Sequence, residues 1–199
     1  MPPLILGSAS PRRAALLREL RVEFVVRPSG AAEVAAAGES AQEFARRIAR
    51  EKGAAVAAEH RAWVLSADTV VVVDGTVLGK PDDASDARRM LRRLSGREHQ
   101  VMTAVALTQP DGSIADELIV SSTVEFRSLS AAEIDAYIAS GEPFDKAGAY
   151  GIQGGAARFV VRVHGSYSNV VGLPMDEVRN LLERYGILPV EARRGARSS

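Results

Sequence analysis

Hydroxyl and guanidinium groups cluster near the start of the chain, where residues 8–13 read Ser-Ala-Ser-Pro-Arg-Arg. Ser10 is suited to cap a helix and Pro11 to its first position, so free backbone N–H groups are expected here. Helix starts bind anions, and Ser8, Arg12 and Arg13 add further donors. An ordinary capped helix is the alternative, but basic residues in a first turn oppose the helix dipole. The segment therefore favours a phosphate site, although the Walker loop pattern is absent.

A single carboxylate interrupts the most apolar stretch of the chain. Asp68 lies within residues 64–73, which read Val-Leu-Ser-Ala-Asp-Thr-Val-Val-Val-Val. A carboxylate inside a buried strand costs several kcal/mol unless a cation or strong donors compensate it. A bound metal and Lys80 are the two candidate cations close by in sequence. The alternative, a bulge or strand end that turns Asp68 to solvent, is disfavoured by the apolar residues on both sides.

Lysine is rare in this chain. Of the 25 basic residues only Lys52, Lys80 and Lys146 are lysines, which leaves 22 arginines. A lysine retained against this bias supplies a compact, flexible point charge, as ammonium does beside phosphate. Chance codon use explains the same count equally well. Pro81 favours an extended backbone at Lys80, which would direct that side chain across the end of the sheet.

Residues 145–154, Asp-Lys-Ala-Gly-Ala-Tyr-Gly-Ile-Gln-Gly, are rich in small side chains, as needed where backbone approaches a ligand closely. The alternative interpretation is that this segment is a loop that only covers the core. Gln153 has the donor and the acceptor that reading a base edge requires, but glutamine in a loop is usually just solvated. Glu33 and Lys52, each taken alone, are typical of solvated surface charges.

The metal chemistry open to the chain is narrow. It has no cysteine, and its three histidines, His60, His99 and His164, are scattered in a way typical of structural residues. Any metal should therefore be held by carboxylates and water, which favours Mg²⁺ or Mn²⁺ over zinc. No Gly-x-Ser-x-Gly elbow supports a serine nucleophile. Together these residues suggest phosphoryl chemistry on a small anionic substrate, without indicating which bond breaks.

Hydrophobic periodicity and capping signals predict the elements that must position these groups. Strands are expected at residues 4–6, 23–27, 63–73, 99–108, 114–126 and 159–163, with a short return strand ending at Leu78. Helices are expected at residues 11–20, 40–58, 85–94, 130–139 and 174–185, and residues 31–38 form a loop. Alternating helices and strands, followed by long antiparallel strands, predict an α/β fold with a mixed, mostly antiparallel sheet and flanking helices.

Composition describes the setting of this fold. The 199 residues carry 25 basic and 25 acidic side chains, and 46% are hydrophobic, as in globular proteins. Balanced charge argues against nucleic acid or an anionic membrane as partner, and no apolar run reaches the ~20 residues of a membrane helix. We expect a cytoplasmic protein with one domain over residues 1–188 and a flexible tail over residues 189–199.

Five segments, in this order, resemble the Maf family. They are residues 8–13, residues 66–71 (Ser-Ala-Asp-Thr-Val-Val), residues 78–81 (Leu-Gly-Lys-Pro), residues 145–154, and Gly165-Ser166-Tyr167 with Val171-Gly172-Leu173-Pro174. The resemblance implies a fold similar to inosine triphosphate pyrophosphatases, with two lobes around a cleft, often as a homodimer. It also implies a nucleoside triphosphate pyrophosphatase that uses a divalent metal (Mg²⁺ or Mn²⁺), and a link to inhibition of septum formation.

The resemblance implies residue roles as well. Asp68 would bind or orient the metal-activated water or serve as its base, and with Glu33 it would be a metal ligand, while Arg13, Lys52 and Lys80 would neutralise the departing pyrophosphate. Arg12, Thr69 and Gln153 match the subgroup that prefers dTTP and UTP over 7-methyl-GTP. The full set of expected substrate-binding residues is Ser8, Ser10, Arg12, Thr69, Lys146 and Gln153.

Two other functions fit the same residues. The cradle of residues 8–13 would equally serve a regulator of cell division that binds nucleotides with little turnover. A pyrimidine pocket could also act mainly on modified nucleotides such as pseudo-UTP or 5-methyl-UTP, which it would not easily exclude. In each case the partner is a small nucleoside triphosphate and not a nucleic acid.

Overall fold

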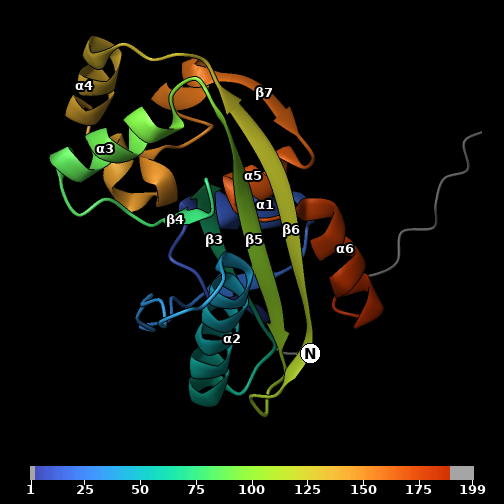
Figure 1. Cartoon of the computed structure of the whole chain (residues 1–199). Coiled ribbons are helices and arrows are strands. Elements are labelled where there is room, and N and C mark those ends of the chain that lie inside the picture. Colours follow the sequence, from blue (N-terminus) through green and yellow to red (C-terminus); the bar gives the residue numbers. More distant parts are fainter. Residues whose placement is uncertain (1–2, 189–199) are drawn as a thin grey trace, which may run out of the picture.

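The seven strands of the described chain, residues 3–188, form one sheet in this computed structural model. Figure 1 shows the two longest, β5 and β6, running side by side through the molecule. The strands are β1 (Leu4–Leu6), β2 (Phe24–Val26), β3 (Val64–Val73), β4 (Thr76–Leu78), β5 (Glu98–Thr108), β6 (Ile114–Phe126) and β7 (Val160–His164). The tail predicted at residues 189–199 lies outside the described residues.

The sheet is mixed and mostly antiparallel, as the sequence predicted. Its order is β2-β1-β3-β5-β6-β7, and β4 pairs with β3 off this path. β1 runs parallel to β2 and to β3, and the other pairs are antiparallel. The turn between β5 and β6 follows its sequence signal: Gly112 takes a positive φ of 88°, and Ser113 N–H donates to Asp111 Oδ1 at 2.9 Å.

Helices cover both faces of the sheet. The α-helices are α1 (Pro11–Glu19), α2 (Ala41–His60), α3 (Ala84–Leu94), α4 (Ala131–Ala139), α5 (Tyr167–Val171) and α6 (Met175–Arg184). Three 3₁₀ helices are η1 (Glu142–Asp145), η2 (Ala147–Ala149) and η3 (Gly155–Phe159). In Figure 1, α3 and α4 gather at one end of β5, while α2 lies nearer its other end.

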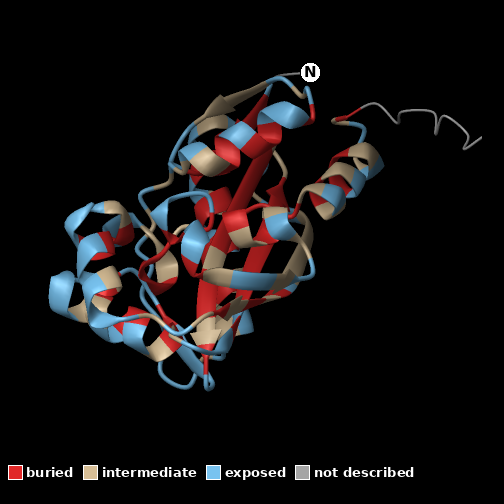
Figure 2. Ribbon diagram, turned by 90° about the horizontal axis from the view of Figure 1, so that it is seen from above, coloured by how far each residue is buried: buried red, intermediate tan, exposed pale blue. Residues whose placement is uncertain are grey.

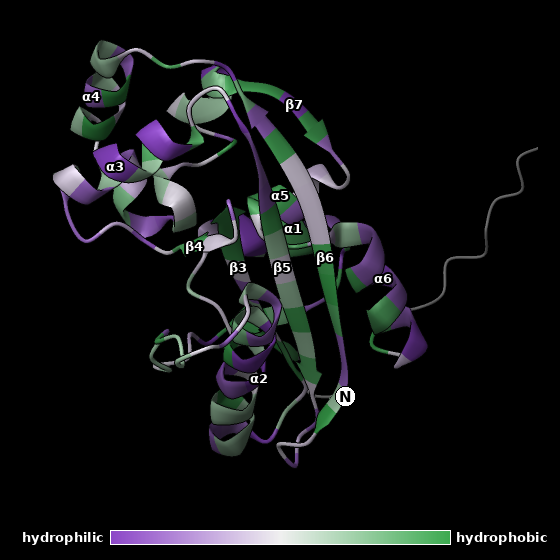
Figure 3. Cartoon of the chain, in the orientation of Figure 1, coloured by the Kyte–Doolittle hydropathy of each residue, from purple (hydrophilic) through white to green (hydrophobic). Residues whose placement is uncertain are grey.

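Two apolar layers therefore sandwich the central strands. On one face, Ala45 and Ala49 of α2 pack against Val70 and Ala104. The larger cluster on the opposite face includes residues of β3 and β5 together with α1, α3, α4 and α6. Figure 2 shows burial concentrated in the central strands, and Figure 3 shows the hydrophilic sides of α3 and α6 facing outward.

The predicted helix starts are confirmed in detail. Ser10 caps α1, where its Oγ accepts from Arg13 N–H at 3.4 Å, and Pro11 takes the first position. Ser40 and Glu43 form the predicted capping box of α2, and α4 has the same arrangement. These local signals hold because they depend on neighbours only three residues apart.

Other local predictions need correction. No helix was predicted from the sequence at α5 or at the three 3₁₀ helices, which are too short to show helical periodicity. The last strand starts at Val160 and not at Phe159, which ends η3. Within residues 3–188 the structure contains no helix that is both long enough and apolar enough to span a membrane.

Candidate active site

The edge of β3 that faces β1 and β4 has an unpaired stretch in its middle. β1 pairs with β3 as far as Leu65, and β4 begins to pair with it at Val71. In the described chain no strand pairs with residues 66–70 on this edge, whereas β5 pairs with them on the other. We call this unpaired stretch, residues 66–70, the edge opening. Because successive side chains of a strand point to opposite faces, it gives access to Asp68 on one face and Thr69 on the other.

A cavity of about 720 Å³ lies at the edge opening. It corresponds to the cleft that the family resemblance implied, and segments from both ends of the sheet line it. Every site residue predicted from the sequence is on its wall: Ser8, Ser10, Arg12, Arg13, Glu33, Lys52, Asp68, Thr69, Lys80, Lys146 and Gln153. The structure brings these residues together around one cavity, and the role of each remains a prediction.

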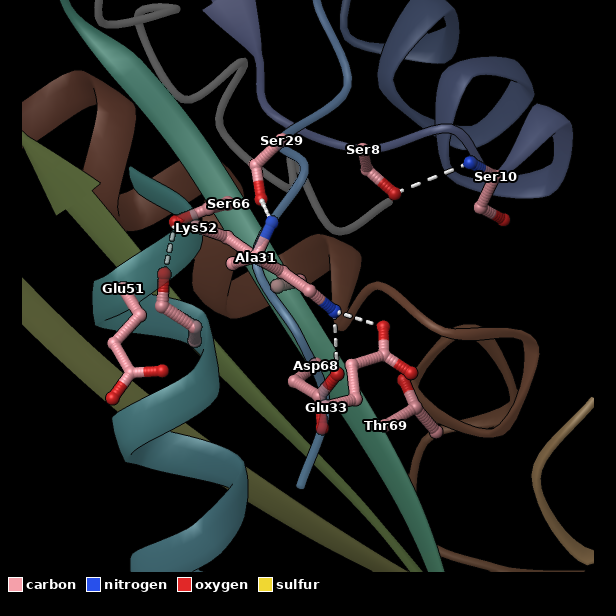
Figure 4. Close-up of polar contacts among 12 residues, drawn as sticks. Ser8, Ser10, Ser29, Ala31, Glu33, Glu51, Lys52, Ser66, Asp68 and Thr69 are labelled. Carbon is pink, nitrogen blue, oxygen red and sulfur yellow. Dashed lines mark hydrogen bonds and ion pairs between the residues drawn. The ribbon is translucent and has the colours of Figure 1, made fainter. Parts of the chain in front are cut away.

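Four charged side chains of alternating sign form a chain across the cavity. Lys52 Nζ donates to Asp68 Oδ1 at 2.7 Å and to Glu33 Oε1 at 2.6 Å. Lys80 Nζ donates to the other Glu33 oxygen, Oε2, at 2.7 Å. Figure 4 shows the Lys52 ammonium lying between the two carboxylates. These side chains become more exposed from Asp68 to Lys80: those of Asp68 and Lys52 are nearly buried, and that of Lys80 is 53% exposed.

Each of these charges depends on the next. Burial raises the pKa of Glu33, but hydrogen bonds from Lys52 and Lys80 outweigh it and lower the pKa to about 2. Asp68 and Lys52 lie in the low-dielectric interior, where an unpaired charge costs several kcal/mol. Glu33 therefore stays ionised at neutral pH, and the four side chains present both carboxylate and ammonium groups to a ligand.

Helix α2 brings Lys52 to Asp68 because it approaches the sheet closely. Gly53 allows this approach: a Cβ there would lie 2.3 Å from Thr108 Oγ1 and 2.8 Å from Ser66 Oγ. The contact is secured by Ser66, whose hydroxyl donates to the carbonyl of Ala49 at 2.7 Å. The glycine that follows Lys52 thus sets the distance between the helix and β3.

The cation beside Asp68 is not the one that sequence proximity favoured. Lys80 was the candidate partner, but it contacts Glu33, and Lys52 occupies the place beside Asp68. The expectation that Lys52 taken alone is a solvated surface charge is also wrong, since its side chain is 10% exposed. Both corrections arise from the packing of α2, which a local sequence pattern does not reveal.

Arg13 fills the edge opening from the side opposite α2. Its guanidinium donates to the carbonyls of Ala67 (2.9 Å) and Gly172 (2.8 Å). It also donates to the hydroxyls of Ser8 (3.1 Å) and Thr69 (2.9 Å). Burial lowers its pKa, while Asp68 and Glu33 act in the opposite direction. Among residues 3–188, four of its five N–H groups are thus bound to protein, which leaves one for a ligand.

The hydroxyls of the predicted phosphate cradle are already engaged with their own loop. Ser8 Oγ accepts from Ser10 N–H at 3.2 Å, as Figure 4 shows, and also from Arg13. Ser10 Oγ is the cap of α1. Each serine keeps its own proton, so both still have a donor for a phosphate oxygen at the helix start.

The opposite wall of the cavity comes from the loop around η1 and η2. Arg12 Nη1 lies 3.6 Å from Asp145 Oδ2, which ties this loop to the start of α1. Lys146 is 11% exposed, and its ammonium binds Asp145 and the carbonyl of Glu142. Lys146 therefore organises the loop, while Gln153 is exposed to the cavity.

With this geometry established, comparison with known proteins identifies the family. The family model described as Maf-like protein matches residues 3–185. A dTTP/UTP pyrophosphatase of Desulfotalea psychrophila is 48% identical over 94% of this chain and 97% of its own length. One of Myxococcus xanthus is 51% identical over 92% of this chain and 93% of its own.

The chain belongs to the Maf family.

The fold of this Maf chain also occurs outside the family. A HAM1 protein from Coxiella burnetii superposes with a TM-score of 0.51 at 15% sequence identity, over 92% of this chain and 100% of that one. This similarity concerns the fold alone, and it agrees with the mixed α/β sheet described above.

Two carboxylates of the cavity suit a hard divalent cation. Within residues 3–188 there is no group of three or more metal-binding side chains, so an all-protein cage is absent from the described structure. Mg²⁺ is commonly held by one or two carboxylates, with the other positions taken by substrate phosphates and water. Asp68 and Glu33, bridged by Lys52, fit that pattern.

Sequence analysis missed residues that lie behind the first layer of the site. Thr103 is opposite Thr69 in the β3–β5 register, and their hydroxyls are 2.9 Å apart. Tyr137 and Glu142 hold the loop that carries Gln153. A signal existed for Thr103, because it interrupts an apolar strand just as Asp68 does.

Proposed function

We propose that this chain hydrolyses dTTP and UTP to the nucleoside monophosphate and pyrophosphate. Relatives about half identical over most of the chain are named dTTP/UTP pyrophosphatase, which supports the substrate class. The observation that carries the proposal is the ammonium of Lys52 held between Asp68 and Glu33 at the edge opening. Such a pair places an ionised base beside a site of positive charge, as phosphoryl transfer needs.

Asp68 is the proposed general base. It accepts a proton from a water molecule, whose oxygen attacks the α-phosphorus in line with the leaving group. The bridging bond between the α-phosphorus and the oxygen of the β-phosphate breaks, and pyrophosphate leaves with that oxygen. The nearly buried position of Asp68 limits access of bulk water to its carboxylate, and the Lys52 ammonium lies 2.7 Å from its Oδ1.

Positive charge in the cavity stabilises the charge that builds up on the pyrophosphate. Lys80 is half exposed, and within the described part of the chain Glu33 is the one carboxylate that holds it, so its ammonium can turn to a phosphate at little cost. Lys52 contributes its charge from a fixed position, and Arg13 has one free N–H. Each preorganised group of this kind typically contributes ~10²–10³-fold to the rate.

A divalent metal, Mg²⁺ or Mn²⁺, is part of this proposal. Asp68 and Glu33 are the residues that would hold it, since both carboxylates face the cavity. The metal would supply neutralisation of the phosphate oxygens around the scissile bond. Arg12, Thr69 and Gln153 would then bind the base, and Ser8, Ser10 and Lys146 would complete the substrate site.

Product analysis tests the proposal directly. The purified protein is incubated with dTTP, UTP, CTP and GTP in Mg²⁺ or Mn²⁺, and the products are separated by ion exchange. Monophosphate with pyrophosphate from dTTP and UTP is the expected result. Diphosphate with orthophosphate would refute the proposed bond cleavage, and tight binding without products would favour the nucleotide-binding regulator.

The Asp68→Asn variant tests the base itself. Loss of the carboxylate should lower kcat at least ~10²-fold, because the amide cannot accept the proton of the attacking water. Asp116→Asn is the matched control, since Asp116 pairs with Arg184 away from the cavity and its loss should leave kcat unchanged. Thermal melting of both variants confirms that they fold. Turnover near the parental level in folded Asp68→Asn would exclude Asp68 as the base.

A homodimer and a cytoplasmic location complete the proposal, and both rest on the family resemblance and composition. Light scattering of the purified chain gives the mass in solution, and a monomer at micromolar concentration would refute the dimer. Modified pyrimidines such as pseudo-UTP and 5-methyl-UTP belong in the substrate panel, because a pyrimidine pocket does not readily exclude an added methyl group.

A further inference from the structure

Behind Thr69 lies a row of hydrogen bonds that ends on the backbone. Thr69 and Thr103 are directly opposed in the β3–β5 register and share one face of the sheet, with their hydroxyl oxygens 2.9 Å apart. Thr103 is fully buried, and its Oγ1 lies 3.0 Å from the carbonyl oxygen of Asn169 in α5. Two short oxygen–oxygen contacts therefore follow one another.

Counting protons fixes the direction of this row. A carbonyl oxygen can only accept, so the contact between Thr103 and Asn169 requires the proton of Thr103. The contact between Thr103 and Thr69 then requires the proton of Thr69. The reverse arrangement would place lone pairs of Thr103 and Asn169 face to face in a buried site, which is unfavourable.

Arg13 acts on the same hydroxyl from the other side. Its Nη2–H donates to Thr69 Oγ1 at 2.9 Å, which occupies one lone pair and repels the hydroxyl proton. A threonine hydroxyl has one proton and two lone pairs. Because the Thr69 hydroxyl donates its proton to Thr103 and accepts from Arg13 with one lone pair, it keeps a single lone pair for the cavity that it lines.

We propose that Thr103 is a specificity-determining positioning residue: by binding the proton of Thr69, it makes Thr69 a hydrogen-bond acceptor toward the base. This deepens, and rests on, the proposed action on dTTP and UTP. Uracil and thymine carry a donor at N3–H, whereas cytosine has a lone pair at N3. An acceptor facing N3 is satisfied by the first two bases and repelled by the third.

The size of the effect follows from the cost of an unsatisfied polar group. When two acceptors, such as Thr69 Oγ1 and cytosine N3, face each other in a closed site, the cost is large enough to change the rate for CTP relative to UTP by roughly ten- to hundredfold. The measured quantity is the ratio of kcat/KM for UTP to that for CTP. A purely structural role for Thr103 would lower both values together and leave this ratio unchanged.

Thr103→Val removes the hydroxyl while preserving shape. Its loss frees the proton of Thr69, which can then donate to cytosine N3, so the UTP/CTP ratio should fall about ten- to hundredfold. The carbonyl of Asn169 still accepts from Gly172 N–H at 3.0 Å, so it is not left without a partner. Thr103→Ser retains the proton and should retain the ratio.

Thr108→Val is the matched control. Thr108 is a buried threonine on the same strand, and its Oγ1 has no hydrogen-bond partner among the residues that the structure describes. Its replacement should leave the UTP/CTP ratio unchanged. An equal ratio in Thr103→Val and Thr108→Val would overturn the proposal.

The parental protein offers a test that needs no variant. A UTP analogue that carries a methyl group in place of the N3 proton has no donor at that position. Its kcat/KM should be roughly tenfold or more below that of UTP, and an equal value would overturn the proposal. Affinities of α,β-methylene UTP and CTP, measured by calorimetry, give the same discrimination without turnover. Failure of hydrolysis with discrimination intact would refute only the proposed function.

Discussion

Removal of the Lys52 ammonium tests how far the buried ion pair controls the fold. The side chain of Asp68 is 8% exposed, and in the described chain its carboxylate receives a hydrogen bond from Lys52 alone. Lys52→Met keeps most of the length of the side chain and removes the charge. Breaking a buried pair by removing one partner costs about 3–5 kcal/mol, a large share of the 5–15 kcal/mol that stabilises a typical domain.

The double variant Lys52→Met/Asp68→Asn separates this effect from lost packing. An amide in place of the unpaired carboxylate removes the buried charge, so stability should recover by about 2 kcal/mol or more relative to Lys52→Met. Urea unfolding followed by circular dichroism gives the four free energies of the cycle. A loss below about 1 kcal/mol in Lys52→Met, or no recovery in the double variant, would refute the reasoning.

Three further predictions follow from the geometry of the cavity. Because the pKa of Glu33 is lowered to about 2 from 4.5, its ionised form stabilises the fold above pH 4.5. Partial exposure limits this contribution to about 1 kcal/mol, which is lost as the pH falls toward 2. In the Glu33→Gln variant the free energy of unfolding, measured with urea, should therefore depend less on pH between 4.5 and 2. Gly53→Ala places a Cβ 2.3 Å from Thr108 Oγ1, so its melting midpoint should fall by the equivalent of about 1–3 kcal/mol; an unchanged midpoint would mean that α2 can shift freely. Arg13→Lys retains the charge but loses the fork that reaches Ala67 and Gly172, so a loss of about 2 kcal/mol is expected in urea unfolding, and parental stability would contradict the linking role.

The sequence predicts those parts of the fold that depend on near neighbours. The capping box of Ser40 and Glu43 and the turn at Gly112 were confirmed, because each is set by a few adjacent residues. Helix α5 was missed because five residues do not display a helical period. Its position matters nonetheless, since the Asn169 carbonyl accepts from Thr103 behind the cavity, and the carbonyl of Gly172, which caps α5, accepts from Arg13.

The candidate site could be recognised from types of residue, but not from pairings. Asp68 was conspicuous because a carboxylate within a strand of valines needs compensation, and the structure provides it. The compensating group could not be identified as Lys52, because the placement of α2 over the sheet depends on contacts such as that of Gly53 with Thr108. Thr103 shows that hydroxyl groups inside apolar strands merit the same attention as carboxylates.

The edge opening in β3 has a consequence for how this scaffold can diversify. Asp68 and Thr69 are adjacent in the chain, yet their side chains are embedded in separate halves of the protein, one under α2 and the other beside α5. In the function proposed above, Thr69 acts on the nucleobase and Asp68 on the anhydride, and Arg13, which donates to Thr69, connects the two halves. A one-residue shift of β3 against β5, by contrast, would move both side chains to the opposite faces of the sheet at once.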